Sequence, residues 1–200
     1  MKYIIAGTDR PGSNTLKLSH YIQGIYKTLG ENVEIIDLAE VKQFLHTGPH
    51  YGKDDPGVRT YLEKIVSSEG LIVVTPEYNG SMPGVLKYFI DHLKFPESFE
   101  YRPVCFVGLS AGMFGGLRPV EHLQQIFGYR NAFIFPERVF IMNSHKVIDG
   151  QGQVQDEMVK NLLVQQATHF RQFTKALSDA KLDANSFIES KIKASTESKK

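Results

Sequence analysis

Short apolar runs alternate with helical patterns along the chain, and this alternation limits the folds that the chain can adopt. The runs are continuous and rich in β-branched residues, which is typical of strands buried on both faces of a parallel sheet. They cover residues 3–6, 33–36, 71–74, 104–107 and 132–135. Because each intervening helix must cover one face of the sheet, the pattern predicts a three-layer, doubly wound α/β fold with five parallel strands.

The predicted helices follow from apolar side chains at helical spacing, with glycine or proline at several of their ends. They lie before Gly30, over 58–66, from Pro83, after Gly116 and over about 155–177. Residues 1–178 are therefore expected to form one domain. Residues 179–200 are expected to form a tail, rich in Lys and Ser, whose end is mobile.

Composition excludes several classes of protein. A length of 200 residues with 42% hydrophobic content fits one domain with a sizeable core. The formal charge of +1 argues against general binding to nucleic acid or to a membrane surface, because both normally need a basic stripe. The single cysteine, Cys105, lies in an apolar run and is expected to be buried and inert. No segment approaches a membrane span, so we expect a cytoplasmic protein.

The connection after the first strand has the features of an anion site. It reads Gly7-Thr8-Asp9-Arg10-Pro11-Gly12-Ser13-Asn14-Thr15 and opens the first helix. Unpaired amides and the positive end of the helix dipole favour an anion there. The Lys of a Walker A loop and the G-x-G-x-x-G fingerprint are both missing. A single phosphate monoester, held by amides, hydroxyls and Arg10, is the expected group. The alternative is that Ser13 serves only as a helix N-cap.

The connection after the third strand is the most informative stretch for function. It reads Thr75-Pro76-Glu77-Tyr78-Asn79-Gly80-Ser81-Met82-Pro83-Gly84-Val85-Leu86-Lys87. A loop that leaves the carboxyl end of a parallel strand and leads into a helix is where open α/β sheets bind ligands. The alternative is a plain connection, but most of these have only about 2–6 residues. This one is longer and carries Tyr, Asn and Gly together.

The connection after the fourth strand contains the pattern G-x-S-x-G, which also occurs at the nucleophile of serine hydrolases. It reads Gly108-Leu109-Ser110-Ala111-Gly112-Met113-Phe114-Gly115-Gly116. A serine hydrolase that uses Ser110 is therefore an alternative function. Its partners are poorly arranged, because Glu137 and His145 lie only eight residues apart and His169 falls inside the last predicted helix. A hydrolase would also leave the first two loops unexplained.

All three loops leave the carboxyl ends of parallel strands, so we expect them to line one crevice. In the strand order 2-1-3-4-5, strands one and three meet at the switch point, where flavodoxin binds FMN. A phosphate cradle followed by two glycine-containing loops that let backbone approach a flat ring predicts an FMN site. An FMN-binding electron carrier without reductase activity is a second alternative. Such carriers are usually strongly acidic, which a charge of +1 does not match.

These motifs resemble those of the NAD(P)H-dependent FMN reductase family, a flavodoxin-like group that includes azo- and quinone reductases. The stretch from Pro76 to Lys87 is similar to the family's signature loop, and it is the most specific match. Gly7-Thr8-x-Arg10-x-x-Ser13-x-Thr15 resembles the phosphate motif, and Ser110-x-Gly112-x-x-Gly115-Gly116 resembles the third motif. The resemblance covers about residues 1–175.

The resemblance implies an enzyme that passes hydride from NADPH or NADH to FMN and then to free flavin, a quinone or an azo compound. It implies that Arg10, Ser13 and Thr15, beside Thr8 and Asn14, bind the FMN phosphate. It also implies that Pro76 and Glu77 to Ser81 wrap the isoalloxazine edge, and that Ser110, Ala111, Gly112 and Gly115 contact its other end. No side chain is expected to act as a catalyst, because the flavin would perform the chemistry.

The resemblance further implies a homodimer or homotetramer, with Lys87 and Asp91 on the helix used for subunit contact. The segment 88–94 departs from the family pattern, because it lacks the Trp and Ser that often follow that Asp. The sequence does not decide between NADPH and NADH, although Arg118 is a candidate for reading a 2′-phosphate. The loop 46–57 contains His46 and His50, and it is interpreted as a surface or subunit-contact loop, with a metal site as the alternative.

Overall fold

A parallel sheet forms the centre of the molecule in the computed structural model, which describes residues 1–45 and 56–197. Its four long strands are β1 (Lys2–Ala6), β2 (Val33–Asp37), β3 (Gly70–Pro76) and β4 (Pro103–Leu109). The strand order β2-β1-β3-β4-β5 is the predicted 2-1-3-4-5 order, and every pairing is parallel. The predicted flavodoxin-like fold is thus confirmed.

The fifth position of the sheet is divided between two short strands. β5 (Phe133–Ile134) pairs with the beginning of β4, and β6 (Val139–Ile141) pairs with its end. The sequence predicted one strand over 132–135 and missed β6. Pro136 lies between the two strands and has no N–H to give to the β4 ladder, which accounts for the interruption.

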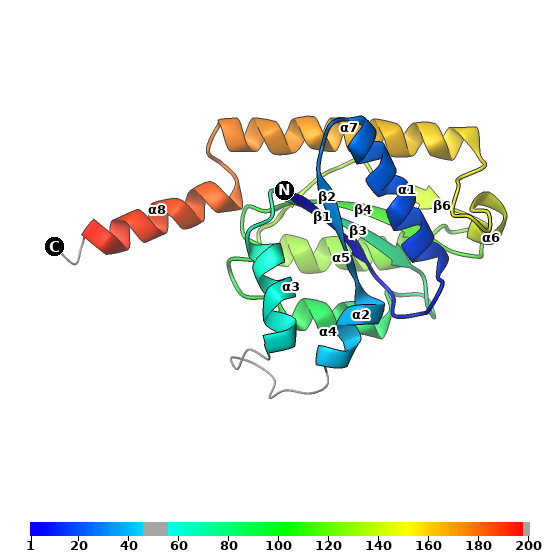
Figure 1. The fold of residues 1–200 in the computed structure, drawn as a ribbon, viewed down its shortest axis with the longest axis horizontal. Coiled ribbons are helices and arrows are strands. Elements are labelled where there is room, and N and C mark those ends of the chain that lie inside the picture. The colour runs from blue at the N-terminus through cyan, green and yellow to red at the C-terminus, as the bar shows by residue number, and fades with distance from the viewer. Residues whose placement is uncertain (46–55, 198–200) are drawn as a thin grey trace.

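Helices cover both faces of the sheet and complete the predicted three layers (Figure 1). α1 (Asn14–Thr28) and α7 (Glu157–Asp179) cover one face. The other face carries α2 (Leu38–Leu45), α3 (Pro56–Val66), α4 (Gly84–His92) and α5 (Leu117–Tyr129). A short helix, α6 (Ser144–Val147), follows β6. None of the helices in the described part of the chain has the length and apolar character to cross a membrane.

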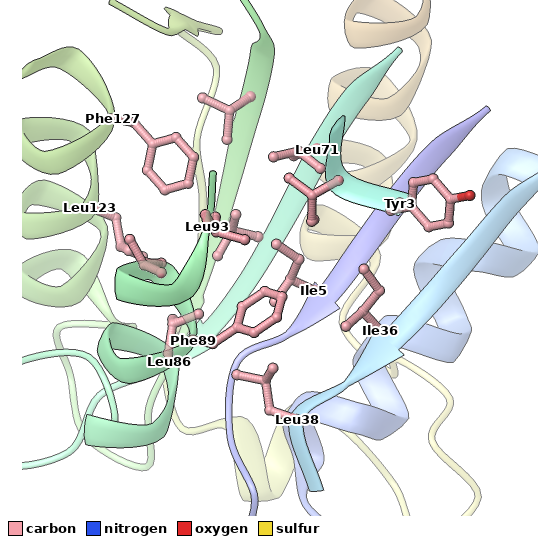
Figure 2. Close-up of a cluster of buried hydrophobic side chains, with 14 of the residues drawn as sticks. Tyr3, Ile5, Ile36, Leu38, Leu71, Leu86, Phe89, Leu93, Leu123 and Phe127 are labelled. Carbon is pink, nitrogen blue, oxygen red and sulfur yellow. The ribbon is translucent and has the colours of Figure 1, made fainter. Parts of the chain in front are cut away.

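The core divides into two clusters because side chains alternate across each strand. In β1, Tyr3 and Ile5 point toward the α4 and α5 side, whereas Ile4 packs on the α1 and α7 side. Figure 2 shows Ile5 close to Phe89 of α4 in the first of these clusters. Both faces of the sheet are therefore buried, as the continuous apolar runs predicted.

The tail contains a helix that the sequence analysis did not predict. α8 (Ala184–Glu197) begins against the domain, where the rings of Phe187 and Tyr101 stack with centroids 4.1 Å apart. The amide of Ala184 also donates to the carbonyl of Tyr101 at 3.1 Å. Figure 1 shows the rest of α8 extending away from the body of the molecule. The expectation of a mobile end falls on the last three residues, which lie outside the described chain.

A close backbone contact fixes the start of α5 beside the end of β4. A Cβ atom added to Gly116 would lie 2.5 Å from the amide nitrogen of Leu109, and one added to Gly108 would lie 2.7 Å from the carbonyl oxygen of Gly116. Gly116 also has a φ of 82°, in the left-handed region that favours glycine. No other residue type fits this approach without a shift. The contact places the first turn of α5 at the carboxyl edge of the sheet.

Candidate functional site

Three loops leave the carboxyl edge of the sheet, where the sequence predicted a ligand site. β1, β3 and β4 are in register there, with Ala6 beside Val74 and Pro76 beside Leu109. Their carboxyl ends therefore meet along one edge. The first loop comprises residues 7–13, the second residues 77–83 and the third residues 110–116.

The first residues of the second loop contact the first loop and the end of β4 that leads into the third loop. The amide of Glu77 in the second loop donates to the carbonyl of Leu109, directly before the third loop, at 3.1 Å. The hydroxyl of Tyr78 lies 2.9 Å from Oγ1 of Thr8 in the first loop. Tyr78 is half-buried, and its hydroxyl is used in this contact. The second loop thus joins the other two.

The first loop leads into the start of α1 and leaves several amides unpaired. Ser13 is buried, and its Oγ accepts a hydrogen bond from the amide of Leu16 at 3.1 Å, so it caps the start of α1. The amides of Asn14 and Thr15, in the first helical turn, have no partner within the helix. The exposed Arg10 can add a positive charge beside them. This arrangement suits an anion.

The second loop contains a tight turn with two left-handed residues. Asn79 has a φ of 51° and Gly80 a φ of 78°, the combination that a type I′ turn requires and that the sequence Asn-Gly favours. Tyr78 and Ser81 exchange both backbone hydrogen bonds, at 2.9 and 3.1 Å. The amides of Asn79 and Gly80 make no hydrogen bond within the described chain. They are the two donors of this turn that remain for a ligand.

Helix α5 holds the second loop from the side. Nη1 of Arg118 donates to Oε1 of Glu77 at 3.0 Å, and Nδ1 of His122 lies 2.9 Å from Oγ of Ser81. The guanidinium of Arg118 also lies over the ring of Phe114 in the third loop, 4.4 Å from its centroid. Arg118 was predicted to have another role, and His122 was not predicted to belong to the site. Their spacing of four residues, at the start of the helix after Gly116, places both side chains on one face of that helix and could have indicated that they act together.

The third loop is anchored to β6 and α6. The carbonyls of Ser110 and Gly112 accept hydrogen bonds from the amides of Ser144 and Asn143, at 2.9 and 3.2 Å. Gly115 is buried, and a Cβ atom there would lie 3.0 Å from the amide nitrogen of Ile141. Packing against β6 therefore requires glycine at position 115.

Two glycines in these loops border open space. A Cβ atom added to Gly12 or to Gly112 would meet no atom within 4 Å, and both residues are exposed. Ala111, next to Gly112, is also exposed. Together with the unpaired amides, these residues leave backbone accessible at the carboxyl edge of the sheet.

The groups of a serine hydrolase do not come together. The hydroxyl of Ser110 donates to the carbonyl of Gly112 at 3.1 Å. Oε1 of Glu137 is 2.6 Å from Nδ1 of His169, so this carboxylate orients a different histidine from His145. In the described part of the chain, Ser110 thus has no histidine as a hydrogen-bond partner. In this chain, the residues of the G-x-S-x-G pattern use their carbonyls to attach the third loop to α6.

Cys105 lies in the core, and the described residues contain no cluster of metal-ligating side chains. Cys105 is completely buried, and burial raises the pKa of its thiol well above the ordinary value, as expected for an inert thiol. Among residues 1–45 and 56–197, no group of three or more His, Cys, Asp or Glu side chains could hold a metal ion. His46 and His50 lie outside these residues.

An α/β fold of this strand order, with β1 and β3 adjacent at its switch point, is of the flavodoxin class. The family model described as NADPH-dependent FMN reductase matches residues 3–146. The chain belongs to this family, and it is an oxidoreductase of the NAD(P)H-dependent FMN reductase and azoreductase type.

Curated relatives agree with this assignment. An NAD(P)H-dependent FMN reductase of Pseudomonas aeruginosa is 32% identical over 81% of this chain and 88% of its own length. An FMN-dependent NADPH-azoreductase of Staphylococcus haemolyticus is 29% identical over 84% of this chain and 93% of its own length. Among solved structures, the flavoenzyme FerB of Paracoccus denitrificans, an NAD(P)H:(acceptor) oxidoreductase, matches with a TM-score of 0.66 and 21% identity, covering 88% of this chain and 96% of its own. The structural match supports the fold.

Proposed function

We propose that the chain binds FMN at the three loops and uses NADPH or NADH to reduce a small-molecule acceptor, namely free flavin, a quinone or an azo compound. The observation that carries this proposal is the meeting of three loops with unpaired amides at the switch point of a sheet from this reductase family. Bound FMN would supply the redox chemistry, taking hydride from the nicotinamide and giving electrons to the acceptor.

The residues of the chain bind and orient. The amides of Asn14 and Thr15 and the guanidinium of Arg10 would hold the phosphate, because a helix start and a positive charge both stabilise an anion. The amides of Asn79 and Gly80 would donate to the ring edge where negative charge builds during reduction. Residues 110–112 and Gly115 would contact the opposite end of the ring.

We expect the purified protein to be yellow. NADPH or NADH should bleach its visible absorbance under anaerobic conditions, and a quinone, free flavin or azo dye should restore the colour. Absorption spectra with and without reductant check this expectation. Colourless protein that takes up no added FMN would rule out the proposal, and yellow protein inert to both nicotinamides would favour the electron carrier. Comparing NADPH with NADH in the same assay determines the preferred reductant.

A homodimer or homotetramer is also proposed, and exposed apolar side chains near the third loop support it. Met113, Phe114 and Met142 are 71%, 50% and 48% exposed, and large apolar side chains gathered on a surface often mark an association face. Lys87 and Asp91 form an exposed ion pair within α4 at 2.7 Å, so neither needs a partner subunit to be paired. Light scattering of the purified protein should give at least twice the mass of the chain, and a monomeric mass would contradict this proposal.

A further inference from the structure

Helix α5 contacts the second loop on both sides of its turn. Arg118 pairs with Glu77, which precedes the turn, and His122 contacts Ser81, which closes it. Residues four apart lie on the same face of a helix, one turn from each other. The two side chains therefore hold the turn at its two ends from one face of α5.

The turn has little of its own to hold it in place. It contains one pair of backbone hydrogen bonds between Tyr78 and Ser81, and an isolated two-stranded hairpin is marginally stable in water. The stem of Arg118 lies beside the turn, since its Cδ would be 3.8 Å from a Cβ atom added to Gly80. The position of the unpaired amides of Asn79 and Gly80 thus depends on neighbouring elements.

Helix α5, which carries Arg118 and His122, is itself held firmly against the core. Val120, Leu123 and Phe127 on its other face are buried in the core, as Figure 2 shows for the last two. The backbone contact between Gly116 and β4 fixes its first turn. A helix held at its start and along its length can transmit a defined position to the loop beside it.

The ion pair between Arg118 and Glu77 has one largely buried member, so its loss should cost more free energy than the loss of a fully exposed pair. The side chain of Glu77 is 12% exposed, whereas that of Arg118 is 47% exposed. Oε2 of Glu77 is buried without a hydrogen-bond partner, so the contact of Oε1 with Arg118 is the ion pair that compensates this carboxylate within the described chain. Losing Arg118 would leave a largely buried charge uncompensated, and the loop would shift to solvate it.

We propose that Arg118 and His122 are positioning residues that hold the Asn79–Gly80 turn so that its two unpaired amides stay aligned for the flavin ring. The part of this inference that concerns the flavin rests on the proposed function. The part that concerns the turn is a property of the chain without cofactor.

The first test measures the turn itself in cofactor-free protein. Hydrogen exchange of the amides of Tyr78 and Ser81 reports the two bonds that close the turn. In Arg118→Ala and His122→Ala, we expect both amides to exchange about fivefold faster or more, because the turn opens locally. Glu121→Gln is the matched control, since this exposed side chain lies on α5 between the two and forms no ion pair in the described structure.

The second test measures FMN affinity by fluorescence titration of the same variants. Each alanine variant should bind FMN about 5- to 30-fold more weakly, the effect of one charged or neutral hydrogen bond. His122→Asn should recover part of the loss, because its amide can still reach Ser81. Arg118→Ala in a Glu77→Gln background should add little to the effect of Glu77→Gln alone, because the two side chains act as a pair.

Exchange rates and FMN affinities equal to those of the Glu121→Gln control would overturn the inference. That result would mean that contacts other than those of Arg118 and His122 hold the turn in place. If wild-type protein binds no FMN, the proposed function fails, while the exchange measurement still decides whether α5 holds the turn. Circular dichroism spectra should match among all variants, because Arg118 and His122 are exposed.

Discussion

Replacing Arg102 by methionine is expected to lower the free energy of unfolding by about 3 kcal/mol, because buried carbonyl groups lose their donors and each such loss costs about 1–3 kcal/mol. The side chain is 1% exposed and lies at the amino edge of the sheet, just before β4. Its guanidinium donates to the carbonyls of Val66 at 2.8 Å, Glu97 at 2.7 Å, Ser98 at 3.1 Å and Ser68. It therefore ties the end of α3 to the segment that precedes β4.

The loss should come from the carbonyls more than from an empty space, because methionine fills much of the volume of the arginine stem. Burial lowers the pKa of Arg102 to about 10, against the opposing effect of the Asp183 charge, so the side chain is still charged at neutral pH. Relief of this buried charge offsets part of the loss, which is why the expected value is well below the sum over all lost bonds.

Urea unfolding of cofactor-free protein at neutral pH, followed by circular dichroism, measures the change. Arg138→Met is the control, because Arg138 is exposed and donates to the side chain of Gln124, and its loss should change the free energy of unfolding by less than about 0.5 kcal/mol. A decrease below about 1 kcal/mol for Arg102→Met would mean that water or a neighbouring donor satisfies the freed carbonyls.

Hydrophobic periodicity predicted the elements that bury a continuous apolar stripe. It failed for a short helix whose start is set by a capping side chain. β1, β3 and β4 are buried along their whole length and were found from their composition. α2 follows β2 without a connecting loop, and its start is marked by Asp37, whose Oδ1 accepts from the amide of Ala39 at 2.9 Å. A strand that passes directly into a short helix gives no turn signal, so this helix was not predicted from the sequence.

The three loops were predicted to line one crevice, but the side-chain contacts that connect them were not predicted. The contact between Thr8 and Tyr78 joins residues 70 positions apart, and that between Glu77 and Arg118 joins residues 41 apart. Local patterns identify helix starts and turns, whereas side-chain pairing between loops depends on how the strands are ordered in space. The docking of α8 through Phe187 and Tyr101 was missed for the same reason.

Replacing Gly112 by valine is expected to weaken FMN binding by about tenfold to a hundredfold, the effect of overfilling a close contact by roughly 1–3 kcal/mol. Cofactor-free protein should keep its stability, because a Cβ atom at this position meets no protein atom within 4 Å and the backbone is outside the left-handed region. A loss of affinity at constant stability is therefore the result expected for a ligand in the space beside the third loop.

The series Gly112→Ala and Gly112→Val should show a graded loss in fluorescence titrations of FMN, because each added methyl group occupies more of that space. Gly150→Val is the matched control, since Gly150 is also exposed with no atom within 4 Å of an added Cβ, but it lies in the turn after α6. It should leave the affinity for FMN unchanged. Wild-type affinity in Gly112→Val would show that the third loop does not approach the cofactor, and the site would then consist of the first two loops.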